Sequence, residues 1–181
     1  METLLPQAYL IGLVVLLAGA AVVVARQIWR VRGEEATLAR LERSNPDQTG
    51  DAGSLYELAS VQLRKRLYGQ AADNLKLALK RAQAAKEPPE ALAVIQNALG
   101  FALAAQGQFK AAVKHYRQAL VAKADYPVAL NNLAFALEKQ FQFDEACSSY
   151  RRVLELDSAN RTAKKRLARL ERTMGSSNQA A

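Results

Sequence analysis

The chain has 181 residues, of which 50% are hydrophobic, and its 25 Lys and Arg against 17 Asp and Glu give a formal net charge of +8. That length suits one compact domain with an appendage. The single cysteine, Cys147, excludes an internal disulfide and a cysteine-based metal cluster, and it gives no indication of an oxidising compartment.

Residues 1–30 are predicted to form a transmembrane anchor. No charged residue occurs between Thr3 and Ala25, and a helix of this length crosses about 30 Å of hydrocarbon at about 1.5 Å per residue. Tyr9 and Trp29 lie near its ends, where aromatic rings favour the membrane interface. The apolar stretch 3–25 lacks an ionisable side chain, which argues against a proton or ion pathway.

The charges that flank the anchor predict its orientation. Arg26, Arg30 and Arg32 follow the apolar stretch, whereas the N-terminal side carries Glu2 and no Lys or Arg. The positive-inside rule therefore places the N-terminus on the lumenal or exoplasmic side and the rest of the chain in the cytoplasm or stroma. A cleaved secretory signal with a small-residue site at 18–20 is the alternative, but the cationic n-region of such signals is missing.

Residues 31–53 are predicted to form an amphipathic juxtamembrane stalk and a linker. The stretch 31–43 is rich in charge and carries Leu38 and Leu41 three residues apart, as in a short amphipathic helix. The stretch 44–53 is a dense cluster of Ser, Asn, Pro, Asp and Gly, which are turn formers. We therefore expect the folded domain to begin at residue 54.

An internal repeat organises the rest of the chain. The residues that recur after 34 positions are Leu99 and Leu133, Gly100 and Ala134, Phe109 and Phe143, Ala112 and Ala146, Tyr116 and Tyr150, and Leu120 and Leu154. An earlier copy, offset by 41 residues, contains Leu58, Ala59, Tyr68, Ala71, Leu75 and Leu79. Antiparallel helix pairs with this period and this mixture of small and large residues are typical of tetratricopeptide (TPR) repeats.

The predicted fold is therefore all-α: a TPR α-solenoid of three helix pairs plus a C-terminal capping helix, after a single N-terminal transmembrane helix. The expected domain is 54–174, with repeats at about 54–86, 93–126 and 127–160, a cap helix at 160–174 and a disordered tail at 175–181.

Helix boundaries are expected at particular prolines and polar residues. Pro88 or Pro89 suits the first turn of one helix, and Asp125 is expected to cap another helix in which Pro127 lies early.

The turns depart from the usual TPR pattern. Gly107 ends the first helix of the second repeat before the next helix begins. Arg66 and Phe141 occupy the equivalent position in the first and third repeats. Gln62 stands where the pattern has a tyrosine, and no repeat carries the tryptophan of the family. These changes are expected to weaken single turns without altering the period.

The sequence offers no catalytic, cofactor-binding or metal-binding residues. His115 is the only histidine, and Cys147 lies beside the small Ala146 on a packing face, where a cysteine behaves as a small hydrophobe. A phosphate-binding glycine loop and a nucleophile with its base are both missing. We expect a non-enzymatic protein with no cofactor and no small-molecule substrate.

The first helix of each repeat is expected to line a concave groove that binds a protein partner. The predicted groove residues are Tyr56, Ser60, Asn97, Phe101, Asn131, Phe135 and Glu138. The asparagines and the phenylalanines are each separated by one repeat, which predicts an amide row beside an aromatic row suited to an extended or helical peptide. The alternative for the two phenylalanines is that they belong to the core between repeats.

The C-terminal helix is strongly basic. Residues 161–172 hold six basic residues against Glu171 alone, and we expect them mostly on the outer, solvated face of a solenoid cap. Lys164, Lys165 and Arg169 are the candidates for electrostatic contact. The groove lacks the basic clusters of chaperone-binding TPR domains, so a chaperone-tail receptor is disfavoured.

The anchor with its exit, residues 9–32, and the first repeat, residues 55–68, resemble the membrane-anchored TPR proteins of cyanobacteria and plastids that assist assembly or stabilisation of photosystem I. The resemblance implies a thylakoid location, repeats facing the stroma or cytoplasm, and photosystem I subunits or assembly intermediates as partners.

Two other hypotheses stay open. An anchored TPR receptor or accessory for protein import or translocation has the same layout. A membrane-surface nucleic-acid binder would use residues 161–172, although we expect no nucleic-acid partner.

Overall fold

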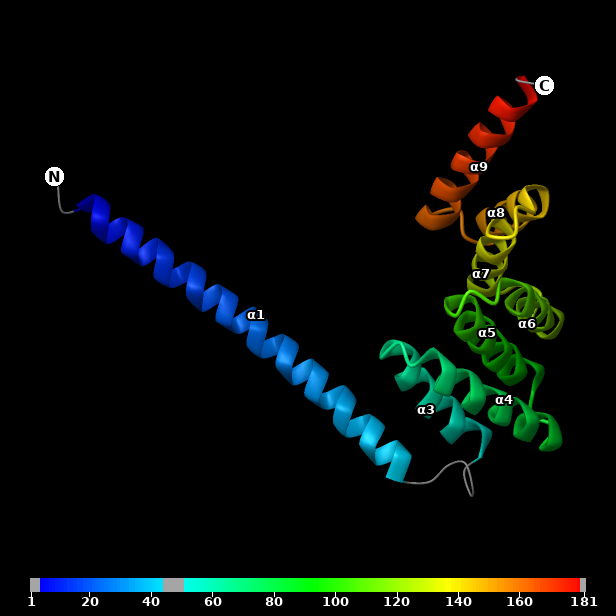
Figure 1. Cartoon of the computed structure of the whole chain (residues 1–181), viewed down its shortest axis with the longest axis horizontal. Helices are drawn as coiled ribbons and strands as arrows, with labels where there is room; N and C mark the ends of the chain where they lie inside the picture. The colour runs from blue at the N-terminus through cyan, green and yellow to red at the C-terminus, as the bar shows by residue number, and fades with distance from the viewer. Residues whose placement is uncertain (1–3, 44–50, 180–181) are drawn as a thin grey trace. The chain divides into compact units, whose positions relative to one another are not determined.

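The computed structural model describes residues 4–43 and 51–179, and within these ranges the chain is built from helices and contains no strands (Figure 1). The chain divides into two units, Met1–Arg43 and Ser44–Ala181. Each unit is described by itself.

The first unit is one continuous helix, α1, at Leu4–Arg43. Its segment Leu10–Trp29 has 20 residues, a mean hydropathy of 2.2 and no buried residue. At about 1.5 Å per residue this segment spans about 30 Å, so its length and composition are compatible with a single-pass membrane anchor. The stretch 31–43 continues α1 without a break.

The second unit contains seven helices in its described residues: α3 Ala52–Arg64, α4 Tyr68–Ala84, α5 Pro89–Ala105, α6 Phe109–Ala122, α7 Pro127–Glu138, α8 Phe143–Leu156 and α9 Arg161–Gln179. Each helix packs against the next one in the chain, and α5 also contacts α3 and α7 (Figure 1). This arrangement is three antiparallel helix pairs followed by one further helix. It confirms the predicted TPR α-solenoid.

The core depends on pairs of one small and one large residue. Tyr116 and Tyr150, at equivalent places in the second helices of two repeats, are both fully buried. A Cβ atom added to Gly100 would lie 2.7 Å from the ring of Tyr116, so this ring fills the space that a side chain on α5 would need. Ala134 stands at the position equivalent to Gly100 and is also fully buried. Small residues on the first helices therefore permit the close packing of the helix pairs.

Several element boundaries differ from the expected ones. Helix α3 begins two residues before 54, because Asp51 accepts a hydrogen bond of 2.7 Å from the backbone N–H of Ser54 and so caps the helix at residue 51. Helix α5 begins at Pro89 rather than 93, since proline suits the first turn. Helix α9 runs to Gln179, beyond the expected end at 174, and no proline interrupts it. Residues 44–50 of the predicted linker and 180–181 of the predicted tail lie outside the described residues.

The turns between paired helices adopt a left-handed backbone conformation. Gly107 has φ of +79°, and Arg66 and Phe141, which replace it in the other repeats, have φ of 61° and 60°. A non-glycine residue is strained in this region.

The expected cap at Asp125 is wrong. The residue that precedes α7 is Tyr126, with no side-chain cap. The Asp125 carboxylate instead accepts a hydrogen bond of 2.9 Å from the guanidinium of Arg152 on α8, an interaction with a charged partner that the backbone N–H groups of α7 do not offer.

Candidate partner-binding groove

The first helices α3, α5 and α7 are neighbours, and α9 follows the third pair and packs against α8. Residues four apart on a helix share one face, so Asn97 with Phe101 and Asn131 with Phe135 lie on equivalent faces of α5 and α7. One more 34-residue step leads from the α7 pair to Lys165 and Arg169 on α9. The groove positions therefore continue into the C-terminal helix, where they carry positive charge.

The asparagine that contacts Asn97 in the groove is one residue away from the predicted Asn131. Asn97 Oδ1 accepts a hydrogen bond of 3.0 Å from Nδ2 of Asn132, not from Asn131. Residues 131 and 132 lie about 100° apart around the helix, so only one of them can face Asn97. Asn131 Oδ1 is buried without a hydrogen-bond partner among the described residues. Sequence reasoning missed Asn132, because the period alone does not set the rotation of one helix against its neighbour.

The two groove phenylalanines differ in exposure. Phe101 is 43% exposed, and its ring lies edge-on to Tyr68 with centroids 6.4 Å apart. Phe135 is partly buried and lies edge-on to Phe109 at 6.2 Å. Both rings thus pack against the preceding repeat, as the core alternative required, but Phe101 also keeps a large free surface. Of the two, Phe101 is the side chain with apolar area to offer a partner.

At the N-terminal end of the groove, Tyr56 and Ser60 are partly buried, and Tyr56 packs against the core. The hydroxyl of Tyr126 accepts a hydrogen bond of 3.5 Å from Asn97 Nδ2. Burial raises the pKa of the Tyr126 hydroxyl, and Tyr56 adds to that effect. The ammonium of Lys123 lies 5.4 Å from the centre of the Tyr126 ring. Tyr126 therefore belongs to this surface, although the sequence analysis did not single it out.

Glu138 is occupied by internal partners. Its side chain is only 10% exposed, and its carboxylate accepts a hydrogen bond of 3.1 Å from Arg166 and another of 3.3 Å from the hydroxyl of Tyr150. Arg169 also pairs with this carboxylate. Glu138 thus connects α7 to α9 within the domain.

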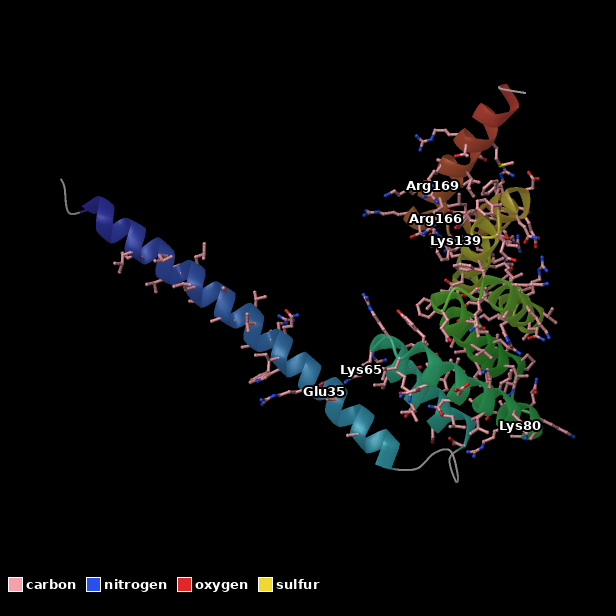
Figure 2. All side chains as sticks on the ribbon, in the orientation of Figure 1. Glu35, Lys65, Lys80, Lys139, Arg166 and Arg169 are labelled. Atoms are coloured by element: carbon pink, nitrogen blue, oxygen red, sulfur yellow. The ribbon has the colours of Figure 1, made fainter. Side chains whose placement is uncertain are left out.

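Most basic residues of α9 are exposed, and Arg166 is partly buried. A hollow of about 450 Å³ is lined by Arg161, Thr162, Lys165, Arg166, Arg169 and Arg172. We name these six residues the basic face. The guanidinium of Arg166 lies over the ring of Phe135, and Lys139 approaches the same ring. Figure 2 shows Arg166, Arg169 and Lys139 at the same end of the second unit. Lys165 and Arg169, two of the three candidates for electrostatic contact, belong to the basic face, whereas Lys164 is exposed outside it.

A second hollow, of about 290 Å³, adjoins the first at Arg169. The residues that line it are Glu138, Lys139, Phe141, Phe143, Arg169, Leu170 and Thr173. Phe141 is 80% exposed and lies edge-on to Phe143 with centroids 6.0 Å apart. Arg169 lines both hollows, so positive charge and exposed aromatic surface are neighbours at this end of the groove.

The described residues hold no group of three or more His, Cys, Asp or Glu that would suit a metal ion. His115 Nδ1 lies 2.7 Å from Oε1 of Gln96. Cys147 is buried, and that burial raises the pKa of its thiol. The surface described above provides hydrogen bonds, aromatic contacts and charge, which are the means of binding a protein partner.

Comparison with protein families supports the repeat assignment. A TPR repeat model matches residues 100–140, and a tetratricopeptide repeat model matches residues 127–160. Among curated relatives, an uncharacterized ycf37 protein of Guillardia theta is 30% identical over 70% of this chain and 70% of its own length. A ycf37 protein of Cyanophora paradoxa, also uncharacterized, is 28% identical over 81% of this chain and 83% of its own.

Solved structures share the fold at low sequence identity. MamA superposes with a TM-score of 0.71 at 16% identity, covering 81% of this chain and 82% of that one. The Sgt2 TPR domain of Aspergillus fumigatus gives 0.63 at 20% identity, over 71% and 82%. The first TPR of Spaghetti (RPAP3), bound to an HSP90 peptide, gives 0.63 at 21% identity, over 69% and 94%. At such identities the likeness concerns the fold alone.

Proposed function

Because the chain belongs to the ycf37 family, we propose that it is a membrane-anchored protein-binding scaffold that assists assembly or stability of photosystem I at the thylakoid membrane. The TPR solenoid is a protein-interaction fold, and α1 contains a segment long and apolar enough for the anchor. The photosystem assignment is supported by the resemblance of residues 9–32 and 55–68 to assembly proteins of that complex. The repeats face the stroma or cytoplasm, since Arg26 and Arg32 lie at the C-terminal end of the apolar stretch.

The binding role is supported by side chains on the first helices that are not fully buried in the core and remain available to a partner. Phe101 keeps 43% of its surface exposed on α5, beside the hydrogen-bonded pair of Asn97 and Asn132. Amides and an open ring on one face suit a segment that brings both backbone polar groups and apolar side chains. The protein therefore acts by holding a partner, and no step of chemistry is assigned to its residues.

Affinity capture tests this function. The full-length protein is used to capture partners from detergent-solubilised photosynthetic membranes, and mass spectrometry identifies them. A Phe101→Ala variant removes the exposed ring of the groove, and Val121→Ala is the matched control, since Val121 is 89% exposed on the second helix α6.

We expect photosystem I subunits with the natural protein and with Val121→Ala, and fewer of them with Phe101→Ala. Capture of translocation components in their place would favour the anchored receptor or accessory for protein import. Absence of photosystem I subunits from every sample would contradict the proposed function.

A further inference from the structure

We propose that the basic face of α9, together with the adjoining aromatic hollow, is the docking site for an acidic protein segment that carries an apolar residue next to its carboxylates. The inference deepens the proposed function and rests on it, because it names the chemical class of partner segment that the scaffold holds. It concerns the C-terminal end of the groove, where the 34-residue period reaches α9.

The basic face has an excess of positive charge that the domain does not neutralise. Arg166 and Arg169 share the single carboxylate of Glu138. Within the described part of the chain, Arg161, Lys165 and Arg172 form no ion pair. The single acidic residue of α9, Glu171, lies outside the lining of the hollow and accepts a hydrogen bond of 2.7 Å from Arg151 on α8. Five cations therefore meet one carboxylate, and an acidic ligand supplies the missing charge.

One of these cations, Arg166, is held in place before a partner arrives. Arg166 lies over the Phe135 ring at 4.5 Å and donates to Glu138 at 3.1 Å, so its guanidinium has little freedom. A planar guanidinium presents a fork of N–H donors that matches a carboxylate. An ordered donor loses less conformational entropy on binding than a mobile side chain does.

The adjoining hollow sets the second requirement for the ligand. Arg169 lines both hollows, and beyond it Phe141 is 80% exposed while Leu170 is buried. A carboxylate placed at Arg169 would bring the next side chains of the ligand over the Phe141 ring. An aromatic or aliphatic side chain at that point covers apolar surface that is otherwise exposed to water.

The combination of positive charge and exposed aromatic surface favours a protein segment over a nucleic acid. A nucleic acid supplies evenly spaced phosphates, but its sugar-phosphate backbone offers no aliphatic side chain for the hollow at Phe141. An acidic segment with an apolar residue fits both hollows.

The direct test measures binding to the full-length protein in neutral detergent micelles. The probe is a fluorescein-labelled peptide with a run of glutamates followed by leucine and phenylalanine, and its twin has glutamine in place of every glutamate. The test variant is the triple Arg161→Gln, Lys165→Gln and Arg172→Gln, which spares the pairs at Glu138. The matched control, Lys80→Gln, Lys110→Gln and Lys114→Gln, removes the same formal charge from exposed lysines outside the basic face.

We expect the acidic peptide to bind and its glutamine twin to bind at least about tenfold more weakly. The test triple should weaken the acidic peptide by about tenfold and the control triple by less than about twofold. Phe141→Ala should weaken it by about threefold, because the ring contact is lost without a change in charge. Equal binding of the two peptides, or equal effects of the two triples, overturns the proposal. So does equal or stronger binding of phosphatidylglycerol in mixed micelles, or of a single-stranded oligonucleotide, to the basic face.

Capture from photosynthetic membranes with the same triples separates this inference from the proposed function. If both triple variants still capture photosystem I subunits, the result contradicts the docking site and remains consistent with the assembly role. A peptide result as expected, with no photosystem I subunits captured by the natural protein, would keep the acidic-segment site and remove the assembly role.

Discussion

The guanidinium of Arg166 lies over the ring of Phe135, with Cζ 4.5 Å from the ring centroid. The two residues come from α9 and α7, so the C-terminal helix is attached to the last repeat through a groove position. The ammonium of Lys139 approaches the same ring at 5.5 Å. A cation near an aromatic face is attracted by the electrons of the ring. Phe135 is thus used by the domain itself.

The first prediction concerns the different roles of the two groove phenylalanines. Phe135→Ala should lower the free energy of unfolding by about 2 kcal/mol, less than for a fully buried ring because Phe135 is only partly buried. Phe101→Ala should lower it by less than about 1 kcal/mol, since that ring is 43% exposed. Urea unfolding of the full-length protein in detergent, followed by circular dichroism, measures both values. Equal losses would mean that the two rings have the same role.

The second prediction concerns the carboxylate that joins α7 to α9. Glu138→Ala should destabilise the domain by about 2 kcal/mol, because it leaves Arg166 and the hydroxyl of Tyr150 without a partner in a largely buried place. Glu155→Ala is the matched control. Glu155 is 62% exposed and pairs with Arg152 at the surface, so its loss should change stability by less than about 0.5 kcal/mol. Similar urea midpoints for the two variants would contradict the structural role of Glu138.

The third prediction follows from the contact of Gly100 with Tyr116. Gly100→Ala places a Cβ atom 2.7 Å from a fully buried ring, so it should destabilise the domain by about 1 to 3 kcal/mol. Gly69→Ala should have the opposite effect. Nothing lies within 4 Å of its added Cβ, and alanine is a better helix former than glycine by about 0.5 to 1 kcal/mol. Thermal melts of the two variants should therefore shift in opposite directions from the natural protein.

The fourth prediction concerns the strained turns. Arg66 is exposed and has φ of 61°, a conformation that costs an L-residue about 1 kcal/mol and glycine almost nothing. Arg66→Gly should therefore raise the thermal midpoint or leave it unchanged, despite the greater flexibility of glycine in the unfolded chain. Gly107→Ala, at the equivalent turn with φ of +79°, should lower it. A loss of stability in Arg66→Gly equal to that in Gly107→Ala would show that the backbone conformation does not decide the outcome.

Sequence periodicity was sufficient to predict the fold because each helix pair repeats the same packing problem. A small residue such as Gly100 recurs opposite a large one such as Tyr116, and the next repeat carries Ala134 and Tyr150. Such a pattern is dictated by the close contact of two helices and tolerates little change. Departures from the repeat pattern occur instead at the αL turns of Arg66 and Phe141. Side chains in these exposed turns make few packing contacts, so substitution there is tolerated.

The candidate site was predicted less completely, for two physical reasons. The period identifies the groove face of each helix but not the small rotation that decides whether Asn131 or Asn132 meets Asn97. Contacts between side chains of different helices, such as Arg166 with Phe135, depend on that rotation too. Lys165 and Arg169 were predicted for electrostatic contact, but the continuation of the groove positions into α9 was missed, because the residue types change there from Asn and Phe to Lys and Arg. The 34-residue period, extended one step into α9, was the signal that would have found it.

The last prediction concerns His115 and the pH dependence of stability. Burial lowers the pKa of His115 below its usual 6.5, and the nearby charges of Lys114 and Lys76 add to the effect. The unfolded chain therefore binds this proton more readily than the folded protein does, so acidification through about pH 6.5 favours unfolding. The loss begins near the pKa of the unfolded state and stops increasing once the pH is below the folded value.

A His115→Gln variant lacks the titrating ring, so comparison with it isolates the contribution of this group from those of all other residues. The stability difference between the natural protein and the variant should shift toward the variant as the pH falls from about 7.5 to about 5. Urea midpoints measured across this range provide the test. Parallel curves would mean that His115 is protonated as easily in the folded protein as in the unfolded chain. That result would contradict the partly buried position beside Gln96 at 2.7 Å, because burial in that position is what opposes the charge.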